Sequence, residues 1–182
     1  VHAAVKGCDA VVHLAAQVSV PRSMEYPEET IDINVGGTAN LLEACRALDV
    51  SRFVMASSAA VYGTNDAFPL DEAHAGAFHS PYADSKWQNE LQVQEAKQAG
   101  MEAVALRFFN IYGKSSNAVI AKFLAQKIQN KKITIYGNGK QKRDFVHIDD
   151  LCDAILKAIK NNKYDNSTYN LGSGKAISIN DL

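Results

Sequence analysis

Short apolar runs alternate with longer amphipathic stretches along this chain. The runs Asp9–Ala16, Ser51–Ser57 and Met101–Phe109 are rich in Val, Ala, Phe and Leu, as expected for strands that are buried in a parallel sheet. Each run is separated from the next by a stretch with helical periodicity. The order strand, helix, strand, helix, strand predicts an α/β fold built on a doubly wound parallel sheet.

Two helices are predicted between these strands. Pro27, followed by Glu28 and Glu29, suits the first turn of one helix. The other runs from Pro81 to Ala99 and is closed by Gly100, a residue typical of helix C-terminal caps. The inward face of the first helix follows a 3.6-residue period through Ile31, Val35, Thr38, Leu42, Cys45 and Leu48.

After residue 110 the pattern loosens. A short strand is predicted at Ile133–Ile135, and Asp149 or Asp150 caps a further helix. We expect one domain, with the cofactor-binding sheet mainly in 1–110, a substrate-binding part mainly in 111–147, and a returning helix and strand in 148–171. Predicted inward-facing residues are Ile120, Phe123, Leu124 and Ile128 in a helix over Val119–Gln129, and Leu151, Ile155 and Ile159 in the later one.

The ends of the sequence and the positions of its glycines indicate whether the chain is a fragment of a longer protein. Val1–Lys6 has the character of the tail of an element, and Ser178–Asp181 is a capping-box variant that typically opens a helix. A nucleotide-binding sheet of this class carries a Gly-rich turn after its first strand, and we expect that turn upstream of Val1. Gly137–Gly139 and Gly172–Lys175 are interpreted as ordinary turns. The chain is therefore predicted to be a fragment that lacks both ends.

Composition narrows the class of protein. The 182 residues are 47% hydrophobic with net charge −1, which allows one ordinary core and shows no bias toward nucleic acid or an anionic membrane. No apolar run approaches the roughly 20 residues of a spanning helix, and no basic-then-apolar leader opens the chain. Cys8, Cys45 and Cys152 lack metal-ligand or redox spacing. We expect a cytoplasmic protein without a metal site.

Tyr82 and Lys86 stand four residues apart near the start of a predicted helix, so their side chains share one helix face. A phenol titrates near ~10, and a neighbouring ammonium favours its ionised form. Ser58 ends the second strand, at the sheet edge where ligands of open α/β sheets bind. The three side chains indicate a proton-transfer site, although a tyrosine and a lysine at this spacing also occur on ordinary solvated helices.

With these residues in view, the chain resembles the extended short-chain dehydrogenase/reductase family, and within it the NAD-dependent sugar-nucleotide epimerase/dehydratase group. The resemblance implies a Rossmann-like fold, bound NAD, a nucleotide-sugar substrate of the UDP-hexose class, and a homodimer. The motifs that carry it stand in the family's order at Val12–Ala16, Asn34–Thr38, Ser57–Gly63, Tyr82–Lys86, Leu106–Asn110 and Tyr136–Phe145.

The resemblance also implies roles for particular residues. Tyr82 would be the catalytic base, Lys86 would also bind the nicotinamide ribose, and Ser58 would bind the sugar hydroxyl that Tyr82 deprotonates. Asn110 and Arg143 would contact the substrate's diphosphate, a chemically sensible use of an amide and a planar cation. The remaining cofactor-binding residues would be Leu14, Ala15, Ala16, Asn34 and Ser57.

Several of these residues have a structural alternative. His13 ends an apolar strand and is interpreted as a packed imidazole rather than an acid or base. Arg143 could be a solvated member of a basic run, and Asn110 could simply stabilise a turn. Asp149 and Asp150 are interpreted as a helix start, because no other metal-ligand spacing accompanies them.

One local difference from the resembled family favours a particular reaction. Dehydratases of the resembled group carry an acidic pair directly after the active-site hydroxyl, and related decarboxylases carry a glutamate there. Ala59 and Ala60 occupy these places, and a methyl group cannot donate a proton to a leaving hydroxyl. Epimerisation at C4, which needs only Tyr82, is preferred. Ser19–Ser23 resembles the loop of 4-epimerases that act on UDP-glucose, UDP-galactose or their N-acetyl forms.

Two alternatives remain open. Another sugar-nucleotide enzyme of the same scaffold, such as a uronate epimerase, decarboxylase, dehydratase or reductase, would keep Tyr82, Lys86 and Ser58. A non-catalytic NAD(P)-binding module would instead be expected to lose this set, and all three residues are present. The residue that distinguishes NAD from NADP would lie upstream of Val1.

Overall fold

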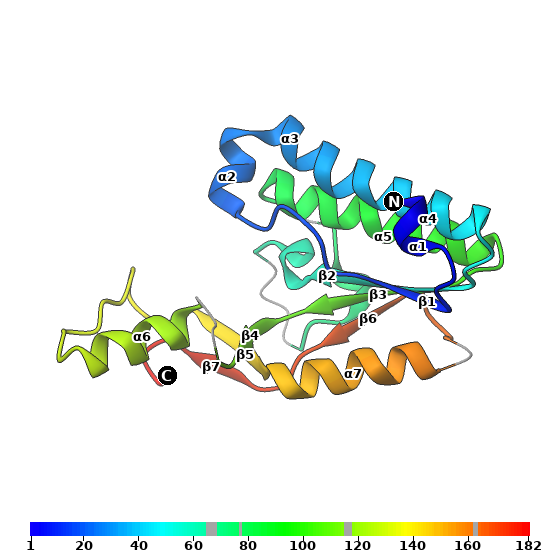
Figure 1. The fold of residues 1–182 in the computed structure, drawn as a ribbon. Helices are drawn as coiled ribbons and strands as arrows, with labels where there is room; N and C mark the ends of the chain where they lie inside the picture. The colour runs from blue at the N-terminus through cyan, green and yellow to red at the C-terminus, as the bar shows by residue number, and fades with distance from the viewer. Residues whose placement is uncertain (65–68, 77, 115–117, 162–163) are drawn as a thin grey trace. The chain divides into compact units, whose positions relative to one another are not determined.

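The computed structural model describes residues 1–64, 69–76, 78–114, 118–161 and 164–182. The chain forms two compact units. The first contains Val1–Arg107 and Leu156–Asn170, and the second contains Phe108–Ile155 and Leu171–Leu182. Figure 1 shows the elements of both, coloured along the chain.

A four-stranded sheet in the order β1-β2-β3-β6 is the centre of the first unit. Strands β1 and β2 are parallel, and His13 at the end of β1 pairs with Met55 of β2. Their carboxyl ends therefore meet at one edge of the sheet. The strands span Ala10–His13 (β1), Arg52–Ser58 (β2), Glu102–Phe108 (β3) and Thr168–Leu171 (β6). The prediction of an α/β fold with a parallel sheet is confirmed.

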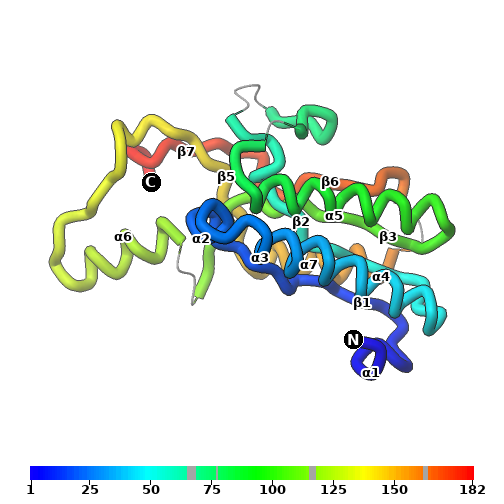
Figure 2. Tube along the Cα trace, turned by 90° about the horizontal axis from the view of Figure 1, so that it is seen from above, coloured from blue at the N-terminus to red at the C-terminus, as the bar shows by residue number. Residues whose placement is uncertain are grey.

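The long helices of this unit cover one face of the sheet (Figure 1). Figure 2 shows α4 and α5 running side by side. α3 (Pro27–Ile31) continues into α4 (Gly37–Ala47) through a π-helical turn at Asp32–Gly36, and α5 spans Pro81–Gln98. Gly100 follows with φ of +97°, so the predicted C-terminal cap is confirmed. The remaining short helices are α1 (His2–Val5) and α2 (Val20–Glu25), with 3₁₀ turns at Ala59–Tyr62 and Glu72–His74.

The core of the first unit lies between these helices and the sheet. Phe53 and Met55 of β2 and Ala103 and Ala105 of β3 are at most 1% exposed, and alternate positions of each strand therefore face the helices. The helices contribute Leu42, Ala44, Cys45, Val93 and Ala96 to the same cluster. Ser57 and Arg107 continue these two rows of inward-facing residues toward the carboxyl edge, where the packing becomes polar.

A smaller sheet, in the order β4-β5-β7, forms the second unit. β4 pairs with β5 in parallel, and β7 pairs with β5 antiparallel. The strands span Asn110–Tyr112 (β4), Lys142–His147 (β5) and Ala176–Ser178 (β7). Two helices belong wholly or partly to this unit, α6 (Val119–Ile128) and α7 (Ile148–Lys160).

Three expectations for the second half need correction. Residues 131–136 have no regular structure, because no strand in the described part of the chain pairs with the expected Ile133–Ile135 strand. In α6, Leu124 and Ile128 were expected to face inward but are 56% and 81% exposed. α7 begins at Ile148, before either aspartate that was expected to cap it, and His147 rather than an aspartate accepts a backbone N–H in its first turn.

Candidate active site

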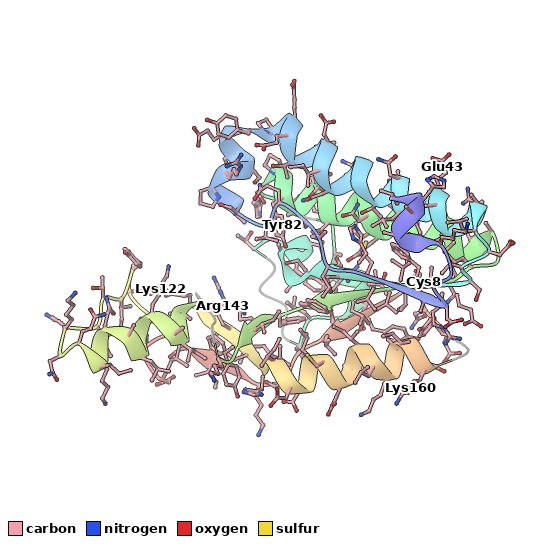
Figure 3. The ribbon with its side chains drawn as sticks, viewed as in Figure 1. Cys8, Glu43, Tyr82, Lys122, Arg143 and Lys160 are labelled. Carbon is pink, nitrogen blue, oxygen red and sulfur yellow. The ribbon has the colours of Figure 1, made fainter. Side chains whose placement is uncertain are left out.

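Tyr82 and Lys86 lie in the first two turns of α5. The helix starts where it does because the Ser80 hydroxyl accepts the Ala83 N–H at 3.1 Å and Pro81 fits the first helical position. Tyr82 is 9% exposed and Lys86 is 5% exposed, so both side chains face into the unit. Figure 3 labels Tyr82 on this helix. The four-residue spacing thus places the two groups on one buried face.

Ser58 completes the group from the carboxyl end of β2. Its hydroxyl accepts the Ala60 N–H at 3.2 Å, which starts the 3₁₀ turn after the strand. The same side chain is hydrogen-bonded to Tyr82, and this bond lowers the pKa of the phenol. The structure therefore brings together the three residues that the sequence indicated for proton transfer.

Burial dominates the electrostatics of this cluster. It raises the pKa of Tyr82 above its usual value, and the Ser58 hydrogen bond offsets this rise only in part. Burial lowers the pKa of Lys86 to about 8, against the attraction of Glu90. The expectation that Lys86 lowers the pKa of Tyr82 is therefore not met in this structure. The physical reason is that the Lys86 ammonium bonds the Ala56 carbonyl at 2.9 Å, while Tyr82 is itself desolvated.

The loop after β1 lies at the same sheet edge. β1 ends at His13, and Leu14 is 56% exposed where a buried residue was expected. Ala15 is also exposed and Ala16 is half-buried. A strand end that presents backbone and small side chains at the carboxyl edge is the usual place for a dinucleotide. These residues fit the predicted NAD, and Tyr82 and Lys86 would supply polar groups for it.

Asn34 is hydrogen-bonded inside the protein, beside the loop after β1. It is 1% exposed, and its amide is engaged on both sides: Oδ1 accepts the Gln17 N–H at 2.7 Å, and Nδ2 donates to the Gln17 carbonyl at 3.0 Å. Nδ2 also donates to the Ser85 hydroxyl at 2.9 Å. Asn34 therefore ties the loop after β1 to α5 between Tyr82 and Lys86. Its relation to a cofactor is through the loop it holds.

His13 and Ser57 are likewise engaged inside the protein. His13 shares a 3.0 Å hydrogen bond with Thr38, and burial together with the nearby Lys86 charge lowers its pKa to about 4. It is a packed neutral imidazole at pH 7, as the sequence indicated. The Ser57 hydroxyl donates to Glu90 at 2.5 Å, so this side chain could meet a cofactor only as an acceptor.

Sequence reasoning missed the charged pair behind these residues. Glu90 and Arg107 form an ion pair with an N–O distance of 2.7 Å, and their side chains are 4% and 3% exposed. Two signals could have found it. Glu90 continues the four-residue spacing of Tyr82 and Lys86, and Arg107 interrupts an apolar strand.

Asn110 and Arg143 belong to the second unit. The Asn110 amide donates to the Asp144 carbonyl at 3.0 Å, across the β4–β5 pair. This bond supports the structural alternative for Asn110, and it also fixes the backbone next to Arg143. Arg143 is exposed on β5, where Figure 3 labels it, and it donates to the Lys142 carbonyl at 2.7 Å.

Within residues 1–64, 69–76, 78–114, 118–161 and 164–182, no group of three or more His, Cys, Asp or Glu side chains could hold a metal ion. No helix in the same ranges is long and apolar enough to cross a membrane.

The chain is similar to known proteins over nearly its whole length. The family model described as the NAD dependent epimerase/dehydratase family matches residues 1–172. A putative UDP-glucose 4-epimerase of Methanocaldococcus jannaschii is 39% identical over 97% of this chain and 59% of its own length.

Two solved structures extend the comparison. A UDP-N-acetylglucosamine 4-epimerase from Methanobrevibacter ruminantium is 33% identical with a TM-score of 0.92, over 98% of this chain and 59% of its own. An NAD-dependent NDP-hexosamine 5,6-dehydratase of tunicamycin biosynthesis is 33% identical with a TM-score of 0.90, over 99% and 60%. This chain therefore spans about three fifths of the length of such proteins.

Proposed function

This chain belongs to the NAD dependent epimerase/dehydratase family, and from that premise we propose that the complete protein epimerises a UDP-hexose at C4. The observation that carries the proposal is the meeting of Tyr82, Lys86 and Ser58 at the carboxyl edge of the sheet. The substrate class rests on the relatives, among which are 4-epimerases named for UDP-glucose and UDP-N-acetylglucosamine.

Tyr82 has the part of proton acceptor in this reaction, which requires its phenolate form, disfavoured by burial and favoured by the Ser58 hydrogen bond. Its hydroxyl is paired with Ser58, so a sugar hydroxyl that enters between them can donate to Tyr82 while it is oriented by Ser58. The loop after β1, with Tyr82 and Lys86, would hold NAD, which would supply a reversible hydride acceptor at C4 and so allow inversion through a 4-keto sugar with no net change of the cofactor. Tyr82 gives the proton back in the second half of the cycle.

Lys86 supplies charge close to the phenol. Its Nζ lies 6.0 Å from the centre of the Tyr82 ring. It bonds the Ala56 carbonyl at 2.9 Å, and an ammonium has two further protons for the hydroxyls of a bound ribose. Because its pKa of about 8 lies close to neutrality, Lys86 is a cation at pH 7 that loses its charge in mildly alkaline solution.

Arg143 and Asn110 are assigned to the diphosphate of the substrate. Arg143 is exposed on β5, and its planar guanidinium can bind phosphate oxygens in a bidentate way. Asn110 supports the backbone beside it through the Asp144 carbonyl. We propose that Asn110 acts mainly by holding Arg143 in place.

The residues after Ser58 argue against elimination of water. Ala59 and Ala60 form the 3₁₀ turn beside the hydroxyl, and neither can donate a proton. The similarity to a 5,6-dehydratase keeps dehydration as the second candidate. Dehydration would require an acid from another part of the complete protein.

Product analysis of the complete protein tests the proposal. The protein is incubated with NAD and separately with UDP-glucose, UDP-galactose and their N-acetyl forms, without added reductant, and sugar configuration is followed by proton NMR. C4 interconversion of at least one pair is expected. Dehydration or decarboxylation of a sugar without interconversion would overturn the epimerase assignment. Equal rates for wild type and Tyr82→Phe would overturn the assigned site.

A further inference from the structure

The ion pair of Glu90 and Arg107 is bidentate and almost fully buried. Arg107 Nη2 lies 2.7 Å from Glu90 Oε2, and Nε donates to Oε1 at 2.9 Å. Burial alone would lower the pKa of Arg107, but its interactions with Glu90 and, less strongly, with Tyr62 outweigh burial and raise that pKa. Burying two charges is costly, and well-packed apolar residues of similar volume are often as stable. Stability is therefore a weak explanation for the pair.

The bonds of Glu90 lead to the reacting side chains. Its Oε1 accepts a hydrogen bond from the Ser57 hydroxyl at 2.5 Å. Ser58 is the next residue of β2 after Ser57. On its own helix, Glu90 follows Lys86 by one turn, as Lys86 follows Tyr82. The consecutive β2 residues Ala56, Ser57 and Ser58 are thus each hydrogen-bonded by one of the α5 residues Lys86, Glu90 and Tyr82.

Arg107 anchors the same arrangement on its other side. Its Nη1 donates to the Tyr62 hydroxyl at 2.8 Å and to the Glu72 carbonyl at 2.7 Å. Tyr62 in turn donates to Asn170 of β6 at 2.5 Å. The pair therefore connects α5 and β2 to β3, to β6 and to the 3₁₀ turn that follows Ser58.

We propose that Glu90, held by Arg107, is a positioning residue for the reaction: it fixes α5 against β2 so that Ser58 meets Tyr82, and its carboxylate follows Lys86 by one turn of the same helix. This inference rests on the proposed function of Tyr82, Lys86 and Ser58. It adds a residue that touches neither substrate nor cofactor. Glu90 acts through Ser57 on one side and through Lys86 on the other.

The effect of the Glu90 charge can be measured as a change in the pKa of Lys86, because few of the residues that the structure describes face Lys86. On its own helix Lys86 faces Tyr82 and Glu90. From β1 it faces His13, from β2 the Ala56 carbonyl, and behind Glu90 lies Arg107 of β3. Glu90 is the only one of these groups that raises the pKa of Lys86, against burial. Loss of the Glu90 carboxylate must therefore lower that pKa further.

Glu90→Gln in the complete protein is the direct test. The amide keeps the volume and removes the charge. We expect kcat to fall about 10- to 100-fold with little change in the KM of the nucleotide sugar, as for a slightly misplaced catalytic group. In the same variant without substrate, NMR titration of the Lys86 side chain, assigned with Lys86→Met, should give a pKa below the wild-type value of about 8.

Glu102→Gln is the matched control. Glu102 also pairs with an arginine across strands β2 and β3, with Nη2 of Arg52 at 2.5 Å, but at their opposite ends from Ser58. Its substitution should leave kcat and the Lys86 pKa at wild-type values. A Glu90→Gln variant with wild-type kcat and an unchanged Lys86 pKa would overturn the proposal.

The double variant Glu90→Met with Arg107→Met covers the case in which Glu90→Gln does not fold. It removes both charges together and leaves no unpaired one. We expect a folded protein with kcat reduced about 10-fold or more. A folded double variant with wild-type kcat would overturn the positioning role. The Lys86 titration needs no turnover, so the proposal is tested even if the complete protein proves not to be an epimerase.

Discussion

Lys86 approaches Tyr82 over its ring, with Nζ 6.0 Å from the ring centre, while its hydrogen bond goes to the Ala56 carbonyl. The phenolic oxygen has its own partner in Ser58. The two groups are therefore desolvated side by side, and burial disfavours the charged form of each. The pKa of Tyr82 is raised and that of Lys86 is lowered to about 8.

Tyr82→Phe should reduce kcat by about 10²- to 10⁴-fold, because the phenyl ring keeps the shape but cannot accept a proton. The KM for the nucleotide sugar should change little, since the diphosphate contacts are made elsewhere. Steady-state kinetics of the complete protein separate the two constants. A large rise in KM with unchanged kcat would contradict the role of base.

Ser58→Ala should raise the pKa of Tyr82 further, because the Ser58 hydrogen bond is what opposes the effect of burial on the phenol. Ultraviolet difference titration detects tyrosine ionisation, and Tyr82→Phe identifies the contribution of this residue among the 7 tyrosines of the chain. Identical titration of Tyr82 with and without Ser58 would show that the bond does not tune the phenol.

Lys86→Met should abolish turnover and yet stabilise the protein at pH 7. The folded protein releases the Lys86 proton near pH 8, whereas the unfolded chain holds it to about 10.5. Below pH 8 both states are protonated and the folded state bears the cost of the buried charge, up to about 3 kcal/mol. The advantage of the methionine should shrink between pH 8 and 10.5. Urea unfolding across this range measures it, and a constant difference would contradict the shift.

His13 should make the protein less stable in acid. Its pKa is lowered from 6.5 to about 4, so between these values the unfolded chain takes up a proton that the folded protein does not. Stability falls as the pH falls through this window, by up to about 3 kcal/mol. His13→Asn should remove that part of the slope, while His2→Gln, at an exposed histidine, should not. Parallel slopes for His13→Asn and wild type would refute the prediction.

Gly172→Ala should destabilise the second unit. A Cβ at this position would lie 2.8 Å from Asp144 Oδ2 and 3.2 Å from Phe109 Cγ. Asp144 accepts the backbone N–H groups of Ser173 and Gly174 at 2.7 and 2.8 Å, and displacing it breaks both bonds. A loss of about 1–3 kcal/mol is expected in urea unfolding.

Gly36→Ala is the control for that substitution. Nothing lies within 4 Å of a Cβ at Gly36, and its backbone is helical with φ of −62°. This variant should be neutral or more stable by up to about 1 kcal/mol. Equal losses for the two alanines would contradict the steric argument at Gly172.

Local patterns predicted much of this protein. The strands around Val12, Phe53 and Val104, and the helix that carries Tyr82, follow from apolar runs and caps that depend on near neighbours in sequence. The same holds for Tyr82 beside Lys86. Their approach to Ser58 follows from a general rule, that parallel strands end at one edge of a sheet.

What the sequence did not predict depends on partners far along the chain. The Ile133–Ile135 segment has strand propensity, but a strand exists only where another pairs with it. Ser57 and Asn34 belong to family motifs, and only the packing of α5 shows that their side chains bond Glu90, Ser85 and Gln17. The Glu90–Arg107 pair joins residues 17 apart from a helix and a strand, beyond any local pattern.

The π-helical turn at Asp32–Gly36 depends on the number of residues in this stretch of the chain. Its wider turn brings Thr30, Asn34 and Thr38, all at most 1% exposed, onto one inward line. Deleting a single residue here would restore the ordinary helical period and take one position out of this inward line. The Asn34 bonds that hold the loop after β1 would then be lost.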